Sequence, residues 1–206
     1  MTNTHPITKV LVVNSSLNGD AGNSNKATAK YLEALKTHQH IDVTEIDLNA
    51  IDLPHLSSQE MEAWSVKEID RTAQQSKLAA FSDDFIKALS NADEIVIGVP
   101  MYNFGIPSTL KAFFDRIARA GITFAYTENG PKGLITGKKV SVIAARGGKY
   151  HGTALDTSSA YVKNFLAFLG MTDVNFYYIE GLAMGGDSAD QAWGKFSEKL
   201  SELNAA

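Results

Sequence analysis

The sequence has 206 residues, of which 44% are hydrophobic and 20% charged, and a formal net charge of −4. This composition is typical of a globular protein, and the acidic balance argues against a nucleic-acid partner. The lack of cysteine excludes disulfides and thiolate chemistry. No apolar run approaches the ~20 residues that span a bilayer, and residues 1–9 contain no signal core, so we expect a cytoplasmic protein without membrane association. At ~100–200 residues per domain, residues 1–206 predict a single domain.

The expected elements alternate between strands and helices. Short apolar or alternating runs predict five strands, at residues 9–14, 41–48, 94–99, 140–145 and 173–180. Apolar residues at helical spacing predict helices at 25–35, in a segment that ends near 90, and at 107–120, 156–169 and 187–203. Residues 122–137 contain aromatic residues and an Asn-Gly-Pro turn signal, which predict an excursion or hairpin outside the core. This alternation predicts an α/β protein with a doubly wound parallel sheet, for which we take the order 2-1-3-4-5.

Unusual loops follow three of the expected strands. After the first strand, residues 15–25 offer hydroxyl, amide and backbone N–H groups and lead into a helix. After the third strand, residues 100–105 combine aromatic and amide side chains, and after the fourth, residues 146–148 are Arg-Gly-Gly. In the order 2-1-3-4-5 these strands are neighbours, so the loops converge on the crevice where open α/β sheets bind ligands.

The chemistry of these loops indicates a phosphorylated planar cofactor such as FMN. Neutral donors at a helix start suit a phosphate, aromatic and amide groups suit a flat ring, and paired glycines permit close approach. The fingerprint G-x-G-x-x-G is absent after the first strand, which disfavours a nicotinamide-type Rossmann site. Each loop also has a simpler interpretation: Ser24 as a helix N-cap, Tyr102 and Phe104 as core residues, and Arg146 as a solvated residue of an ordinary turn.

Residues 100–134, PMYNFGIPSTLKAFFDRIARAGITFAYTENGPKGL, followed by TGKKV and ARGG, resemble the FMN-dependent NADH-azoreductases and NADH:quinone oxidoreductases of flavodoxin-like fold. The similarity extends from residue 9 to about residue 180. By this resemblance, the FMN phosphate is held by Ser16, Gly22, Asn23 and Ser24. The ring is lined by Met101, Tyr102, Asn103 and Phe104, and its pyrimidine end meets Ala145, Arg146, Gly147 and Gly148. Ala145 and the pair Gly22-Asn23 stand where family members often carry hydroxyl groups, so side-chain contacts there depart from the family pattern.

The resemblance implies an enzyme. NADH or NADPH would reduce bound FMN, which would then pass two electrons to a quinone or an aromatic azo compound in a ping-pong sequence without an acid–base side chain. Arg146, or the positive field around it, would favour the anionic reduced flavin. The alternative is a flavodoxin-type electron carrier, although such carriers tend to be more acidic and have no use for the aromatic excursion.

A homodimer with flavin sites built by both chains is also implied. We expect Phe124 or Tyr126 to reach over the flavin as a stacking wall for the substrate, with Phe168 contributed by the partner chain and Asn103 by the ring loop. Apolar residues wrap far around the helices at 107–120 and 156–169, and this surplus predicts a subunit interface. The alternative is burial of these residues beneath the excursion.

Histidine and charge patterns predict little further chemistry. His38 and His40 lie two residues apart without a third ligand, and His5 and His55 lie in polar segments, so we expect no metal site. His151 follows the fourth strand and is either a substrate contact or a solvated loop residue. The mixed run 60–77 is typical of a solvated helical face.

Overall fold

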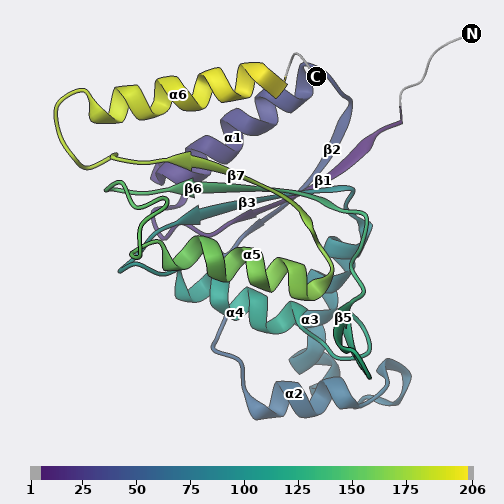
Figure 1. The fold of residues 1–206 in the computed structure, drawn as a ribbon. Coiled ribbons are helices and arrows are strands. Elements are labelled where there is room, and N and C mark those ends of the chain that lie inside the picture. The colour runs from purple at the N-terminus through teal and green to yellow at the C-terminus, as the bar shows by residue number, and fades with distance from the viewer. Residues whose placement is uncertain (1–5, 204–206) are drawn as a thin grey trace, which may run out of the picture.

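Five parallel strands form the central sheet of the computed structural model, in the order β2-β1-β3-β6-β7 (Figure 1). The structure describes residues 6–203, so His5 lies outside this range. The strands are Thr8–Asn14 (β1), Ile41–Asp47 (β2), Glu94–Pro100 (β3), Lys139–Ala145 (β6) and Asp173–Ile179 (β7). The predicted order 2-1-3-4-5 is confirmed, because β6 and β7 are the fourth and fifth strands of this sheet.

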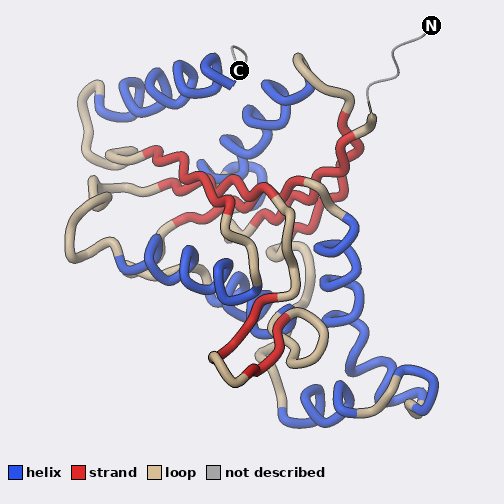
Figure 2. Tube along the Cα trace, turned by 45° about the vertical axis from the view of Figure 1, so that its right-hand side comes forward, coloured by secondary structure: helices blue, strands red, loops and turns tan. Residues whose placement is uncertain are grey.

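Helices cover both faces of the sheet (Figures 1 and 2). One face carries α1 (Asn23–Lys36) and α6 (Ser188–Leu203), and the other carries α3 (Ala73–Asn91), α4 (Ser108–Ile117) and α5 (Thr157–Leu169). Each face has its own buried apolar cluster. β3 is buried along its whole length, which explains the apolar run at residues 95–100. Among the described residues, no helix has the length and hydropathy needed to cross a bilayer.

The apolar surface of α4 is used inside the chain. Phe113 is 1% exposed and packs against Phe85 of α3 and the neighbouring Phe114. Phe114 in turn stacks on Phe165 of α5, with ring centroids 4.3 Å apart. The prediction that α4 carries surplus apolar surface for a subunit interface is therefore wrong, because these residues fill the core between the helices.

The end of α4 also differs from the prediction. The helix ends at Ile117 rather than near residue 120. The hydroxyl of Thr123 donates to the carbonyl of Ile117 at 2.6 Å and accepts from the N–H of Arg119 at 2.8 Å. These bonds replace the next helical turn, so Gly121 belongs to the following turn and is not the C-cap.

A short helix, α2 (Ser58–Ser65), overlaps the first part of the run 60–77, which was expected to be a solvated helical face. Ser57 and Glu60 form a capping box at its start. Both oxygens of the Glu60 carboxylate accept from Arg116 of α4, with Nε–Oε1 at 2.9 Å and Nη2–Oε2 at 2.8 Å. The prediction of a solvated face is wrong for Glu60, because this carboxylate is buried and neutralises a buried arginine.

The expected excursion is a hairpin made of β4 (Phe124–Thr127) and β5 (Gly130–Gly133). It packs against the C-terminal end of α5: the N–H of Ile135 donates to the carbonyl of Leu169 at 2.9 Å. The contact is close at Gly133, where a Cβ atom would lie 2.0 Å from the backbone nitrogen of Gly170. Figure 1 shows that the hairpin lies at the opposite end of the molecule from the carboxyl ends of β3, β6 and β7.

Candidate functional site

The carboxyl ends of β1, β3 and β6 surround a hollow of about 160 Å³. Its walls combine the three predicted loops with a segment after β7, and consist of Ser16, Asn18, Asn23, Ser24, Pro100, Met101, Tyr102, Ala145, Arg146, Gly147, Leu182 and Ala183. Gly22, Asn103, Phe104 and Gly148 lie on the same loops without lining the hollow. Leu182 and Ala183 are site residues that no local sequence pattern marks, because only their pairing with the loop after β6 brings them to the site.

The first turn of α1 offers free backbone donors. Its N-cap is Gly22, which has no side chain to cap the helix. Within the described part of the chain, the N–H groups of Asn23, Ser24 and Asn25 donate to no acceptor. Ser24 lies inside the helix, so its interpretation as the N-cap is wrong. Free N–H groups at the positive end of a helix suit an anion such as a phosphate.

Gly22 and Ser16 fit together closely. A Cβ atom on Gly22 would lie 2.1 Å from the Oγ atom of Ser16. The Ser16 hydroxyl therefore occupies the space that a side chain at position 22 would need. It lies 3.3 Å from the hydroxyl of Tyr102, which also accepts from the N–H of Leu17 at 3.2 Å. The loops after β1 and β3 are thus tied together by hydroxyl groups that can also face a ligand.

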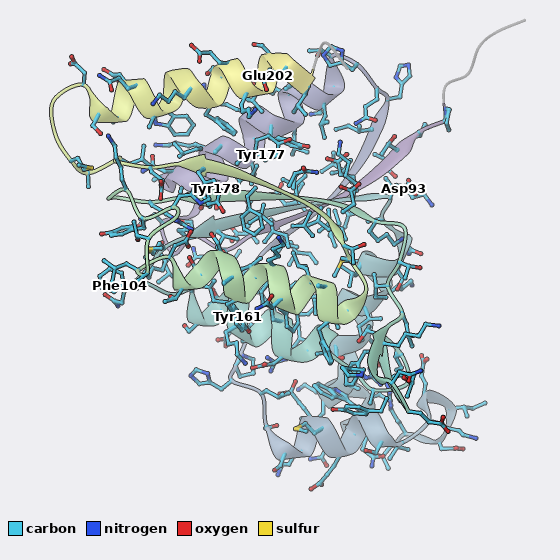
Figure 3. The ribbon with its side chains drawn as sticks, in the orientation of Figure 1. Asp93, Phe104, Tyr161, Tyr177, Tyr178 and Glu202 are labelled. Carbon is cyan, nitrogen blue, oxygen red and sulfur yellow. The ribbon has the colours of Figure 1, made fainter. Side chains whose placement is uncertain are left out.

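The loop after β3 forms a tight two-residue turn. Tyr102 and Gly105 exchange backbone hydrogen bonds of 3.0 and 2.9 Å. Between them, Asn103 and Phe104 have φ angles of +49° and +65°, which non-glycine residues rarely adopt. Phe104 is 47% exposed at the strand-end side of the molecule (Figure 3), so its interpretation as a core residue is wrong. Strained backbone of this kind is concentrated at functional sites.

The backbone carbonyl groups of the loop after β6 accept hydrogen bonds from the segment after β7, whereas two of its N–H groups have no acceptor in the described part of the chain. The carbonyls of Arg146, Gly147 and Gly148 accept from the N–H groups of residues 182, 183 and 181, at 3.1, 2.9 and 3.0 Å. The N–H groups of Gly147 and Gly148 donate to no acceptor among residues 6–203. They are available to the polar edge of a planar ligand.

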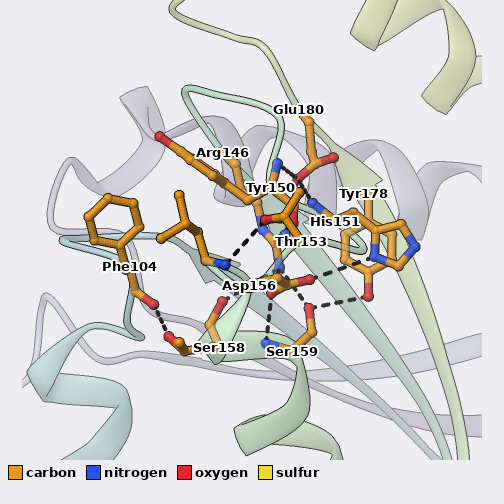
Figure 4. A network of polar contacts seen from close by, with 12 residues as sticks. Phe104, Arg146, Tyr150, His151, Thr153, Asp156, Ser158, Ser159, Tyr178 and Glu180 are labelled. Carbon is orange, nitrogen blue, oxygen red and sulfur yellow. Dashed lines mark hydrogen bonds and ion pairs between the residues drawn. The ribbon is translucent and has the colours of Figure 1, made fainter.

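The side chain of Arg146 does not face the hollow as a free cation (Figure 4). It is 1% exposed and forms ion pairs with Asp156 at 2.6 Å and with Glu180 at 3.0 Å. Burial would raise the pKa of Asp156, but hydrogen bonds from Arg146 and Ser159 outweigh that effect and hold the pKa below its ordinary value. The expectation of a positive field from this residue is wrong, because the two carboxylates more than offset the single charge of the guanidinium. The interpretation of Arg146 as a solvated turn residue is also wrong, because its side chain is buried.

His151 lies beside the same cluster. Its ring stacks on Tyr178 with centroids 3.9 Å apart, and its Nδ1 atom lies 3.6 Å from Oδ2 of Asp156. The histidine side chain is 57% exposed. Among the described residues, no cluster of three or more histidine, cysteine, aspartate or glutamate side chains is arranged to hold a metal ion.

The three expected substrate aromatics lie together in one chain. The ring centroids of Phe124 and Phe168 are 4.4 Å apart, and those of Phe124 and Tyr126 are 5.4 Å apart. They lie at the C-terminal end of α5, whereas the N-terminal end of this 13-residue helix, about 20 Å away, adjoins Arg146. The expected division, with Phe168 from one chain and the excursion from the other, is wrong, because all three residues occupy the same end of the same chain.

Known proteins are similar to this chain in sequence and fold. Residues 8–203 match the family described as having a flavodoxin-like fold. The FMN-dependent NADH:quinone oxidoreductase of Alteromonas mediterranea is 50% identical over 194 residues, which cover 94% of this chain and 97% of that protein. The chain belongs to the family of FMN-dependent NADH:quinone oxidoreductases. The relative of the same name from Cellvibrio japonicus is 46% identical over 198 residues, covering 96% of this chain and 98% of that protein.

Solved structures of azoreductases have the same fold. An azoreductase from Bacillus anthracis matches with a TM-score of 0.85 and 31% identity, over 96% of this chain and 98% of that one. A FMN-dependent NADH-azoreductase from the same species, solved in complex with FMN, matches with a TM-score of 0.82 and 27% identity, over 96% and 99% of the two chains. The family resemblance recognised in the sequence is confirmed.

Proposed function

We propose that this protein is an FMN-dependent oxidoreductase that uses NADH to reduce quinones and aromatic azo compounds. The observation that carries the proposal is the convergence of three ligand-binding loops at the carboxyl ends of β1, β3 and β6. The same chain is 50% identical to an enzyme named FMN-dependent NADH:quinone oxidoreductase. The alternative of a flavodoxin-type electron carrier is not favoured, because the similar proteins carry enzyme names.

The residues at the site fit FMN. The free N–H groups at the start of α1 and the hydroxyls of Ser16 and Tyr102 would hold the phosphate. The turn at residues 101–105 would contact the ring, and the free N–H groups of Gly147 and Gly148 would meet its polar edge. When bound, FMN supplies the two-electron chemistry, and the protein supplies binding and orientation.

The proposal includes a homodimer in the cytoplasm. The hollow of about 160 Å³ is open and smaller than the roughly 300–1,000 Å³ of typical ligand pockets, which supports a site that a second chain completes. Tyr126 is 77% exposed, and Tyr161 is partly exposed on the outer face of α5 (Figure 3). We propose that the aromatic cluster of Phe124, Tyr126 and Phe168 in one chain covers the flavin site of the other and stacks on substrates there.

Cofactor binding and turnover test this function. Purified apoprotein titrated with FMN should quench flavin fluorescence at about one FMN per chain, and released cofactor should be FMN rather than FAD. With NADH and a benzoquinone, the loaded protein should show steady turnover, and NADPH in place of NADH gives the donor preference. Binding of FMN without turnover would support the electron carrier, and lack of FMN binding would overturn the proposal.

A further inference from the structure

Arg146 is held by two carboxylates and a serine hydroxyl (Figure 4). Its Nη1 atom lies 3.0 Å from Oε1 of Glu180, and its Nη2 atom lies 2.6 Å from both Oδ1 of Asp156 and Oγ of Ser159. The side chain is 1% exposed. A planar guanidinium suits this arrangement, because its fixed fork of donors reaches several acceptors at once.

Glu180 connects the guanidinium of Arg146 to the backbone of the loop that follows β6. Its Oε1 atom accepts the N–H groups of Tyr150 and His151, each at 2.8 Å, in addition to Arg146. One carboxylate oxygen therefore fixes both the guanidinium and the chain just beyond Gly148. This anchor adds to the backbone hydrogen bonds that tie Arg146, Gly147 and Gly148 to residues 181–183, and it extends the fixed part of the loop to residues 150 and 151.

Tyr150 and His151, whose N–H groups Glu180 binds, also make side-chain contacts near the candidate site. The ring of Tyr150 lies against Gly148, where a Cβ atom would be 2.7 Å from its Cζ atom, and meets Phe104 edge-on at 5.7 Å between centroids. His151 stacks on Tyr178, and the guanidinium of Arg146 lies 5.0 Å from the centroid of that same ring. Through Tyr150, the ion-pair cluster thus contacts Gly148 and the exposed aromatic turn, in addition to the backbone bonds that hold Gly147 and Gly148.

We propose that Arg146 is a positioning residue for FMN, acting through Glu180 and Asp156 rather than by presenting its charge to the flavin. It holds the loop at residues 147–151 so that the N–H groups of Gly147 and Gly148 stay available to the cofactor. This inference rests on the proposed function. It differs from a direct electrostatic role in requiring the shape of the guanidinium and both carboxylates.

Two substitutions give opposite expectations under the two roles. Arg146→Lys keeps the charge but cannot bridge Asp156, Ser159 and Glu180 together, so positioning predicts at least tenfold weaker FMN binding, whereas a direct charge role predicts little change. Glu180→Gln removes a negative charge near the pocket, so electrostatics alone predicts equal or tighter binding of the anionic cofactor. Positioning predicts weaker binding, because the anchor of the loop loses its charge-assisted bond.

The matched control is Glu60→Gln. It weakens a second buried arginine–glutamate pair, in which Glu60 of α2 binds Arg116 of α4. It should lower the Tm while the FMN Kd stays within twofold of the original value. The measurements are FMN Kd by fluorescence quenching at a temperature where every variant is folded, and visible circular dichroism of bound FMN at saturation. Glu180→Gln should change that spectrum, and Glu60→Gln should not.

Clear results would overturn the inference. Arg146→Lys with a Kd within twofold of the original protein, or Glu180→Gln with equal or tighter FMN binding, contradicts positioning. If Arg146→Lys does not fold, the Glu180→Gln result decides. If the original protein binds no FMN, the proposed function fails and this inference fails with it. If the original protein binds FMN and turns over quinone while both variants bind it normally, only the positioning role fails.

Discussion

At the scale of single residues, Arg116 and Arg146 are buried arginines that serve different regions. Arg116 pairs with Glu60 through two hydrogen bonds and links α2 to α4, whereas Arg146 pairs with two carboxylates beside the flavin loops. Burying a charge is tolerated only where it is paired and hydrogen-bonded. The first pair therefore belongs to the stability of the fold, and the second is placed where it can also affect ligand binding.

The Glu60–Arg116 pair makes a stability prediction. Glu60→Ala leaves an uncompensated charge in the core and should lower the free energy of unfolding by about 3–5 kcal/mol. Urea unfolding followed by far-UV circular dichroism measures this change. Glu202→Ala is the control, because its pair with Lys199 is exposed on both sides and should leave the unfolding midpoint unchanged. Similar effects of the two substitutions would show that the buried pair contributes no more than a surface pair.

At the scale of elements, the hairpin of β4 and β5 adds little to the core of the sheet. Phe124 is buried against Phe168, while Tyr126, two residues along the same strand, is exposed. Phe124 thus attaches the hairpin to α5, whereas the side chain of Tyr126 is exposed and free to contact another molecule. The expected hairpin is confirmed, and Tyr126 is no core residue.

Tyr126→Ala tests the proposed stacking wall. An aromatic contact contributes about 0.5–1.5 kcal/mol beyond area burial, so kcat/KM for quinones and azo dyes should fall by roughly tenfold. FMN content and Tm should stay normal, because the side chain is 77% exposed and lies far from the loops of its own chain. Steady-state kinetics with several acceptors measure the effect, with Glu128→Ala in the same hairpin as control. Unchanged kinetics in the Tyr126→Ala variant with a full complement of FMN would show that Tyr126 does not stack on the substrate.

At the scale of the whole molecule, the carboxyl ends of β3 and β6 and the hairpin of β4 and β5 lie at opposite ends of α5 (Figure 1), so the candidate site and the aromatic cluster are separated by the length of that helix. The two ends could meet only between chains, in an antiparallel arrangement across the face that includes α5. Tyr161 is 36% exposed on that face, beside the half-buried Phe165. This geometry supports the proposed dimer more directly than does α4, whose aromatic residues are buried in the chain's own core.

Tyr161→Asp tests the dimer. A carboxylate in an apolar contact between chains costs free energy, so the variant should sediment as a monomer and should bind FMN and turn over quinone more weakly. Its Tm in dilute solution should fall less than that of Phe113→Asp, which would place a charge in the core. Glu198→Lys on α6, on the other face of the sheet, is the control and should leave sedimentation unchanged. A monomeric Tyr161→Asp with full FMN affinity would contradict the shared site.

Local pattern and strand order were enough to predict much of this protein. Unbroken apolar runs marked the buried strands, the turn signal near residue 130 marked the hairpin, and Gly170 ended α5 with a φ of +100°. Convergence of the three loops followed from the order of parallel strands, since neighbouring carboxyl ends meet at one edge. These features depend on residues close in sequence or on topology, and both can be read without knowing any side-chain contact.

Only the tertiary structure decided which side chains meet across the fold. Glu60 binds Arg116, which is 56 residues away in the sequence, and Arg146 binds Glu180, which is 34 residues away. Neither pairing could therefore be predicted from the residues that adjoin these side chains in the sequence. The placement of Phe124 beside Phe168 likewise required the hairpin to pack on the far end of α5. A charged or aromatic residue looks the same in sequence whether it faces solvent, a ligand or a partner, because its role is set by the groups that folding brings to it.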